Sequence, residues 1–174
     1  MKFTSANTDA EIILSWLSNK TTNTRNSYEY TVKQFMVFID KSLIDVKIED
    51  LQLWIHRLKL TYKPVTIANK VLYIKSLFSF CHQVGYLSIN FASLIRTPRV
   101  KNELSNKILS ISEVKALLEA ARNNQEKAIL SLMYGCGLRV SEVAYLMWTD
   151  LKEDRLTVYG KGEKQEQLFA SFNS

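Results

Sequence analysis

The sequence predicts a mainly α-helical protein in two parts: a helical unit, then a partial α+β unit that ends in a short β-hairpin. Apolar residues recur at helical spacing through most of the first hundred residues. A basic, proline-containing stretch, RTPR at residues 96–99, is typical of a linker. Further on, residues 156–159 alternate apolar and polar side chains, as a half-buried strand does, and run into the sequence GKG. We therefore expect a helical unit at 1–97, a linker at 98–107 and a second unit at 108–174.

The first unit reads as four helices and a short fifth. Residues 8–19 form a helix that Thr8 caps, with Glu11 as the acid of a capping box. The remaining helices are expected at 24–39, at 48–60, from Pro64 to about 84 with Gly85 as its end, and at 90–95. Apolar side chains fall on one face of the first two helices, namely Ile12, Ile13, Trp16, Leu17, Tyr28, Val32, Phe35 and Ile39.

Two helices of the first unit carry candidate binding faces. The helix from Pro64 is expected to bury Ala68, Val71, Leu72, Phe78 and Cys81. Its opposite face offers cations, a hydroxyl, an amide and a phenol, the donors found at phosphates and base edges. We interpret this face as a DNA contact, with a solvated face as the alternative; it comprises Lys63, Thr66, Asn69, Lys70 and Tyr73. The helix 24–39 adds Arg25 and Lys33, although Glu29 between them also fits an ordinary i,i+4 charge ladder.

The charge distribution favours a polyanionic partner. Residues 1–100 contain thirteen Lys and Arg against seven Asp and Glu, whereas residues 101–174 contain ten of each. No acidic residue occurs from Leu51 through Asn102, a stretch with seven basic residues before Lys101. Solvated protein faces usually mix both signs of charge, so a long acid-free stretch points to nucleic acid.

Composition excludes several other classes. The hydrophobic fraction of 47% is ample for a core, and no apolar run approaches membrane-spanning length. The N-terminal residues are polar and lack the apolar segment of a signal peptide. Cys81 and Cys136 show no pairing pattern, and His56 and His82 lie in no Cys/His cluster. We therefore expect a cytoplasmic protein with free thiols, no metal site and no membrane partner.

The second unit is expected to begin with two helices. Serine residues cap a helix that starts near residue 110 and ends at 121, and a second helix spans 125–134. A third helix runs to Leu146 and places Val140, Val143, Ala144 and Met147 at its apolar positions. The strand at 156–159 then pairs with a return strand that begins at 167–169, and residues 160–162 form the turn between them.

A glycine-bent corner links the last two of these helices. Gly135 and Gly137 lie where one helix must end and the next begin, since glycine relieves the backbone at a sharp turn. Arg139 is thereby placed at the junction, and Glu142 lies in the first turn of the new helix, where a negative charge is favoured. An arginine beside an acid at such a junction is a candidate anion site, with a capping Arg–Glu pair as the alternative.

The run from Gly137 to Gly162 resembles the first half of the catalytic domain of the tyrosine recombinase (phage integrase, Xer-like) family. The family motif is Gly-x-Arg-x-Ser-Glu on helices, followed by a strand that ends in Gly-Lys-Gly. Here Arg139 precedes Lys161 by 22 positions. The resemblance covers roughly residues 105–165 well and the preceding unit loosely. It implies a helical (SAM-like) core-binding domain at 1–97 that clamps DNA together with the second unit, while the linker passes beside the duplex and brings Arg99 to it.

The resemblance also implies a reaction and roles for three residues. The family exchanges DNA strands through a covalent phosphotyrosine link, which is phosphoryl transfer without a metal or other cofactor. Arg139 matches the first of the family's two arginines, which stabilise charge on the phosphate oxygens. Lys161 matches the hairpin lysine that donates a proton to the departing sugar oxygen. Glu142 matches the acid that orients the site.

Some features depart from the family pattern. Phe91 follows Asn90 where the family often has proline, and Glu163 and residues 165–167 stand where it prefers basic residues. The family's His-x-x-Arg motif and nucleophilic tyrosine come after the hairpin, and every tyrosine of this sequence precedes it. We therefore expect a C-terminally incomplete recombinase that binds duplex DNA, and other recombinase protomers, without cleaving DNA. The alternatives are a non-enzymatic DNA-binding modulator of a full-length recombinase and a helical protein-interaction module.

Overall fold

The computed structural model of the chain describes residues 3–99, 108–152, 155–159 and 165–169. The chain divides into two compact units, Met1–Asn102 and Glu103–Ser174, and each is considered by itself. The predicted fold class, mainly helical with a short β-hairpin in the second unit, is confirmed. Of the linker expected at 98–107, only its first two residues lie within the described part of the chain.

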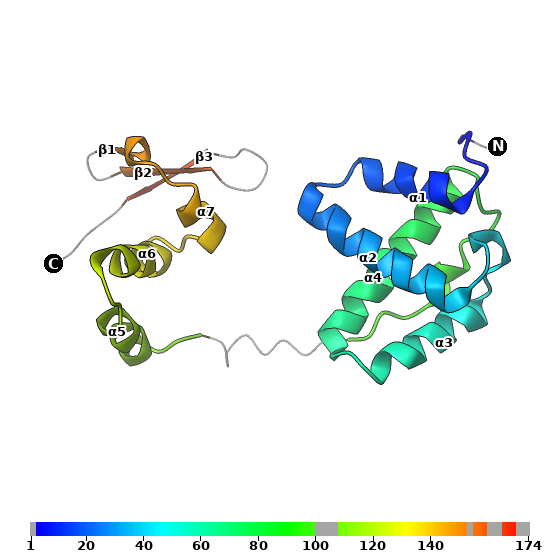
Figure 1. Cartoon of the computed structure of the whole chain (residues 1–174), viewed down its shortest axis with the longest axis horizontal. Helices are drawn as coiled ribbons and strands as arrows, with labels where there is room; N and C mark the ends of the chain where they lie inside the picture. Colours follow the sequence, from blue (N-terminus) through cyan, green and yellow to red (C-terminus); the bar gives the residue numbers. More distant parts are fainter. Residues whose placement is uncertain (1–2, 100–107, 153–154, 160–164, 170–174) are drawn as a thin grey trace. The chain divides into compact units, whose positions relative to one another are not determined.

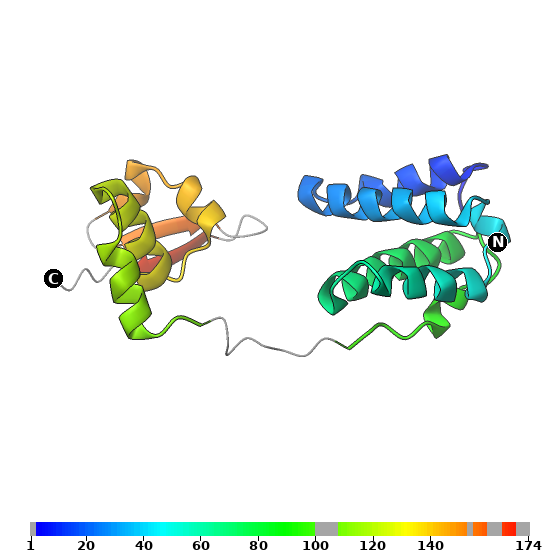
Figure 2. The same ribbon diagram turned by 60° about the horizontal axis from the view of Figure 1, so that its bottom comes forward.

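Four helices build the first unit (Figure 1): α1 (Asp9–Ser18), α2 (Thr22–Ile39), α3 (Ile48–Lys59) and α4 (Pro64–Gln83). Short 3-10 helices lie at Leu43–Asp45 and at Phe91–Leu94, and the latter, η2, stands where a short fifth helix was expected. Figures 1 and 2 both place the α1–α2 turn and the α3–α4 turn at one end of the unit, and the α2–α3 connection at the other. Helix α4 contacts all three of the other helices.

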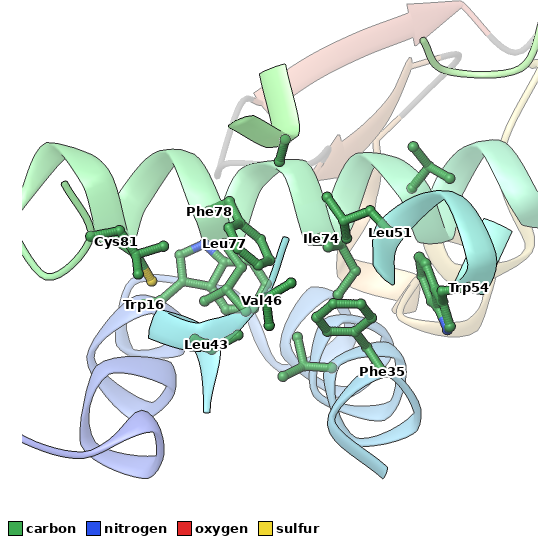
Figure 3. Close-up of a cluster of buried hydrophobic side chains, with 14 of the residues drawn as sticks. Trp16, Phe35, Leu43, Val46, Leu51, Trp54, Ile74, Leu77, Phe78 and Cys81 are labelled. Atoms are coloured by element: carbon green, nitrogen blue, oxygen red, sulfur yellow. The ribbon is translucent and has the colours of Figure 1, made fainter. Parts of the chain in front are cut away.

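The core of the first unit lies between α4 and the other helices, as Figure 3 shows. Phe35 of α2 meets Trp54 of α3 and Phe78 of α4 edge-on, with ring centroids 5.1 and 6.1 Å apart. Leu43 and Val46, from the α2–α3 connection, close the cluster and are buried. Burial of this many large apolar side chains is the main source of the unit's stability.

The buried face of α4 is wider than the sequence pattern suggested. Ile67, Ile74 and Leu77 are buried in addition to the expected Ala68, Val71, Phe78 and Cys81, whereas Leu72 is 50% exposed. The assignment of Leu72 to the core is therefore wrong. The reason is that α4 packs against three helices rather than one, so its buried face is centred on residues 67, 74 and 78 and turns Leu72 to solvent.

Side-chain hydrogen bonds fix the start of α1 and join it to two other segments of the first unit. The predicted capping box at α1 is present: the Thr8 hydroxyl accepts from the Glu11 backbone N–H, and the Glu11 carboxylate accepts from the Thr8 N–H. Asp9 adds two longer-range contacts, because its carboxylate accepts from the Leu43 N–H at 2.9 Å and from the Tyr86 hydroxyl at 2.8 Å. This one side chain thus joins α1 to the segments that follow α2 and α4.

The second unit combines three helices with a small sheet. The helices are α5 (Ile111–Glu119), α6 (Asn124–Gly135) and α7 (Val140–Ala144), followed by a 3-10 turn, η4 (Trp148–Asp150). Strands β1 (Leu151–Lys152), β2 (Arg155–Tyr159) and β3 (Gln165–Phe169) form an antiparallel sheet in that order, with Tyr159 opposite Gln165. Leu138, Leu156 and Val158 form its buried cluster, against which Leu132, Val143 and Leu146 pack.

The helix expected to reach Leu146 is shorter in the structure. Helix α7 ends at Ala144, and Val140 and Met147, both expected to be apolar contacts, are 68% and 69% exposed. A competing local interaction accounts for the early end, since the Asp150 carboxylate accepts from the Met147 N–H and starts the new turn η4. The two-residue strand β1 was not expected from the sequence; it is too short to show a period of two.

Candidate functional site

Arg139 lies at the corner that the glycines were expected to form. Gly137 has a φ of +66°, the next residue, Leu138, is buried, and Arg139 is the N-cap of α7 in an extended conformation. The guanidinium Nη1 lies 2.7 Å from Oε1 of Glu142, and the backbone N–H of Arg139 donates to Oε2 at 2.7 Å. The side chain of Arg139 is 77% exposed while that of Glu142 is only 12% exposed.

This geometry makes Glu142 a fixed support for an accessible cation. The backbone N–H and then the guanidinium of Arg139 hold the pKa of the Glu142 carboxyl below its usual 4.5, so it is ionised at neutral pH. A guanidinium carries five N–H donors in a planar fork, a geometry that matches phosphate as well as carboxylate oxygens. The corner can therefore bind one phosphate oxygen while Glu142 restricts where the guanidinium stands.

Lys161, the third residue assigned to this site, lies outside the described residues. Strands β2 and β3, which flank it in sequence, are paired in antiparallel register from Arg155–Phe169 to Tyr159–Gln165. The predicted hairpin strands are thus present, and the roles of Arg139, Glu142 and Lys161 remain predictions.

The residues assigned to the binding face of α4 divide into two groups. Lys63, the N-cap of the helix, and Asn69 are exposed, and Thr66 is half-buried between them. Tyr73 is half-buried because its ring stacks on Tyr28 of α2, with centroids 4.1 Å apart. The first three side chains can meet a ligand directly, whereas Tyr73 presents only part of its ring.

The expectation that Lys70 shares this exposed face is wrong. Lys70 is 5% exposed, and its Nζ donates to Oε1 of Gln34 on α2. The ammonium also lies over the rings of Tyr30 and Tyr62, 5.0 and 4.8 Å from their centroids. The Gln34 amide in turn donates to both tyrosine hydroxyls. Burial lowers the pKa of Lys70 below its usual 10.5, and this four-residue cluster joins α2, α4 and the turn between α3 and α4.

The two cations assigned on α2 differ in their surroundings. Lys33 forms an ion pair with Glu29 at 2.7 Å, as the charge-ladder alternative anticipates, and its side chain is 73% exposed. Arg25, in the first turn of α2, is exposed. Arg99, which ends the described range 3–99, is also exposed. Lys33 can contact an anion only in competition with Glu29.

Among the described residues, no group of three or more His, Cys, Asp or Glu side chains is arranged to hold a metal ion. The structure also contains no helix, within the described ranges, of the length and hydropathy needed for a membrane span.

Residues 107–172 match the sequence model of the phage integrase family. A tyrosine recombinase XerC of Thermodesulfovibrio yellowstonii is 36% identical over 107 residues, which cover 58% of this chain and 35% of that protein. A tyrosine recombinase of Pseudothermotoga lettingae is 31% identical over 148 residues, which cover 79% of this chain and 51% of that protein. The chain thus spans about half or less of the length of these curated relatives.

Solved structures show the same fold. A lambda integrase tetramer bound to a Holliday junction superposes with a TM-score of 0.77 at 14% identity, over 94% of this chain and 51% of that one. The integrase of transposon Tn1549, in complex with circular intermediate DNA, gives 0.62 at 20% identity, over 93% and 59%. Fold and matched segment together define an integrase-like protein. With its Xer relatives, the chain belongs to the tyrosine recombinase family, as its motifs suggested.

Sequence reasoning missed the partners of Lys70. Gln34 lies 36 residues before Lys70, and the Gln34–Tyr62 contact spans 28 residues, so no local pattern links these side chains. The spacing of Tyr30 and Gln34, four residues apart on one helix, was the only local signal.

Proposed function

We propose that this chain binds duplex DNA as a tyrosine recombinase-family protein, with the first unit gripping the backbone and Arg139 contacting a phosphate. The observation that carries this proposal is the separation of charge along the first unit. The family relationship supports it, since integrases of the same fold have been solved bound to DNA. Other recombinase protomers are the proposed protein partners.

Charge in the first unit is divided between its two ends. The acidic end is where α1 and α3 begin and α2 finishes; it holds the carboxylates Asp9, Glu11, Asp40, Asp45, Glu49 and Asp50, together with the cations Lys41 and Lys47, of which Lys41 pairs with Asp50 at 2.7 Å. The basic end is where α1 and α3 finish and α2 and α4 begin; it holds Lys20, Arg25, Arg57, Lys59 and Lys63. The remaining carboxylate between residues 3 and 99, Glu29, is paired with Lys33.

The helix termini reinforce this separation. The first turns of α1 and α3, at the acidic end, carry Asp9, Glu11, Glu49 and Asp50, whereas the first turns of α2 and α4, at the basic end, carry no acidic residue. A concentrated positive potential attracts a polyanion and accelerates its association. A helical protein-interaction module needs no such separation, which is why DNA binding is the function we favour.

In the second unit, Arg139 is proposed to hold a nonbridging oxygen of the DNA backbone, with Glu142 fixing its position. In phosphoryl transfer the phosphate oxygens carry developing negative charge, so a fixed guanidinium stabilises the transition state. Lys161 is proposed to protonate the sugar oxygen as its bond to phosphorus breaks and a nucleophile, which none of the tyrosines of this sequence matches, bonds to that phosphorus. The chain's own contribution to catalysis would thus be charge stabilisation and proton donation.

Duplex binding by charge-matched variants tests the proposal. Replacing Arg25 and Lys63 by methionine removes two cations from the basic end, and we expect at least a tenfold loss of affinity for a 30-base-pair duplex at about 100 mM salt. The charge-matched control replaces Lys41 and Lys47, two exposed cations at the acidic end, by methionine and should change affinity less than twofold. Equal effects of both variants would contradict the proposed orientation of the first unit.

A further inference from the structure

A pocket on the first unit combines cationic side chains from two separate segments. It has a volume of about 440 Å³ and lies between α3 and the segment of η2 that leads toward the linker. Helix α3 contributes Gln52, Ile55, His56 and Lys59, and the other wall contributes Leu94, Ile95 and Arg96. None of the residues assigned to DNA binding from the sequence lines this pocket.

The polar lining of the pocket suits an anion. Its charged or ionisable side chains are His56, Lys59 and Arg96, joined by the Gln52 amide, and no carboxylate lines it. Within the described ranges, none of these three side chains has an ion pair or a hydrogen bond to the protein. Cationic donors that converge on one hollow without a carboxylate are the arrangement that binds phosphate.

The wall that carries Arg96 is held in place. Lys75 of α4 donates from Nζ to the carbonyl oxygen of Ile95 at 2.7 Å, directly before Arg96. Ile95 is itself buried, and its N–H donates to the Ala92 carbonyl, while Ala92 is fully buried. The backbone beside Arg96 is therefore anchored to α4, and the Lys75 ammonium adds a further cation behind the pocket wall.

We infer that this pocket binds the phosphate of a nucleotide. The cationic groups would hold the phosphate, and the apolar surface of Ile55 and Leu94 would accept the attached sugar. A bare phosphate would leave much of a 440 Å³ pocket empty, so a phosphate ester fits better. The phosphate comes either from the duplex backbone, in which case the site rests on the proposed function, or from a free nucleotide.

Nuclear magnetic resonance on the isotope-labelled 174-residue chain tests the site directly. We expect AMP and inorganic phosphate to shift the side-chain signals of Gln52, His56 and Arg96 in a saturable way, with AMP binding more tightly. The double variant Lys59→Met with Arg96→Met should weaken both by about tenfold or more. Lys47→Met, at the N-cap of α3 and outside the pocket, should leave both affinities unchanged. An equal response to acetate at matched ionic strength, or no saturation, would overturn the phosphate assignment.

Salt-dependent duplex binding then distinguishes the two phosphate sources. If the pocket holds a backbone phosphate, the double variant lowers the magnitude of the slope of log K against log salt by about 0.9, the value for one contact. An unchanged slope together with a lost AMP response assigns the pocket to a free nucleotide. If wild-type chain fails to bind duplex, the proposed function is refuted, while the AMP titration still decides whether the pocket binds phosphate.

Discussion

Arg139 and Glu142 are joined twice, once through the guanidinium and once through the backbone N–H, each at 2.7 Å. The Glu142 carboxylate therefore both accepts from the N-cap N–H at the start of α7 and supports the candidate catalytic arginine. Local capping and site geometry depend on the same side chain, so disturbing one must disturb the other.

Acid should release this pair. The pKa of the Glu142 carboxyl is lowered from 4.5 in the folded chain. The stability that the ionised carboxylate contributes is therefore complete above pH 4.5, and it is lost as the pH falls through the lowered pKa. We expect the Arg139 amide signal to move with a midpoint below pH 4.5 in a magnetic resonance titration. Glu142→Gln should abolish that transition; a midpoint at or above 4.5 would contradict the contact.

The two glycines before Arg139 should respond differently to alanine. Gly137 has a φ of +66°, and an added Cβ would meet nothing within 4 Å, so Gly137→Ala costs only backbone strain, about 1–2 kcal/mol. Gly135 ends α6 without a positive φ and has equal space, so Gly135→Ala should be neutral or stabilising by up to about 1 kcal/mol. Denaturant unfolding of both variants measures the difference; equal effects would refute the corner geometry.

Lys70 should behave as a buried cation and not as a DNA contact. Its folded pKa is lowered from 10.5, so the unfolded chain binds more protons in the window between the two values, and stability rises with pH there. Lys70→Met should remove this rise, as pH-dependent urea unfolding can show. The variant should also leave the salt slope of DNA binding unchanged, whereas Lys63→Met should reduce its magnitude by about 0.9. A smaller salt slope for Lys70→Met would show instead that Lys70 contacts the DNA backbone.

Asp9 should be worth more to stability than its position at a helix start suggests. Asp9→Ala leaves the Leu43 N–H and the Tyr86 hydroxyl without their acceptor, which costs about 1–3 kcal/mol. Asp45→Ala, at an exposed carboxylate of the same end, should stay within about 0.5 kcal/mol of the wild-type chain. Thermal and denaturant unfolding provide the comparison, and equal losses would show that Asp9 does not join these segments.

The sequence predicted those features that depend on neighbouring residues. The capping box at Thr8–Glu11 and the serine cap of α5 at Ser110 involve side chains within three positions of the backbone groups that they bind, so the pattern alone identifies them. The Arg139 corner follows likewise from Gly137 and the adjacent helix start. Each of these features is decided by the local backbone.

Features decided by tertiary packing were beyond the sequence pattern. Lys70 looked like a surface cation because helical spacing groups it with Lys63 and Thr66, and only contacts from α2 and the α3–α4 turn bury it. Leu72 looked buried because it is apolar, yet α4 turns it outward. The anion pocket likewise joins α3 to residues after η2, which no periodicity connects.

The salt dependence of duplex binding by the 174-residue chain tests the central proposal most directly. Because the proposed grip consists of contacts between cationic side chains and backbone phosphates, log K should fall linearly with log salt, by about 0.9 for each phosphate contacted. With several basic residues at one end of the first unit, we predict a slope of about −3 or steeper. A slope near zero, or no binding at low salt, would contradict DNA binding by this chain.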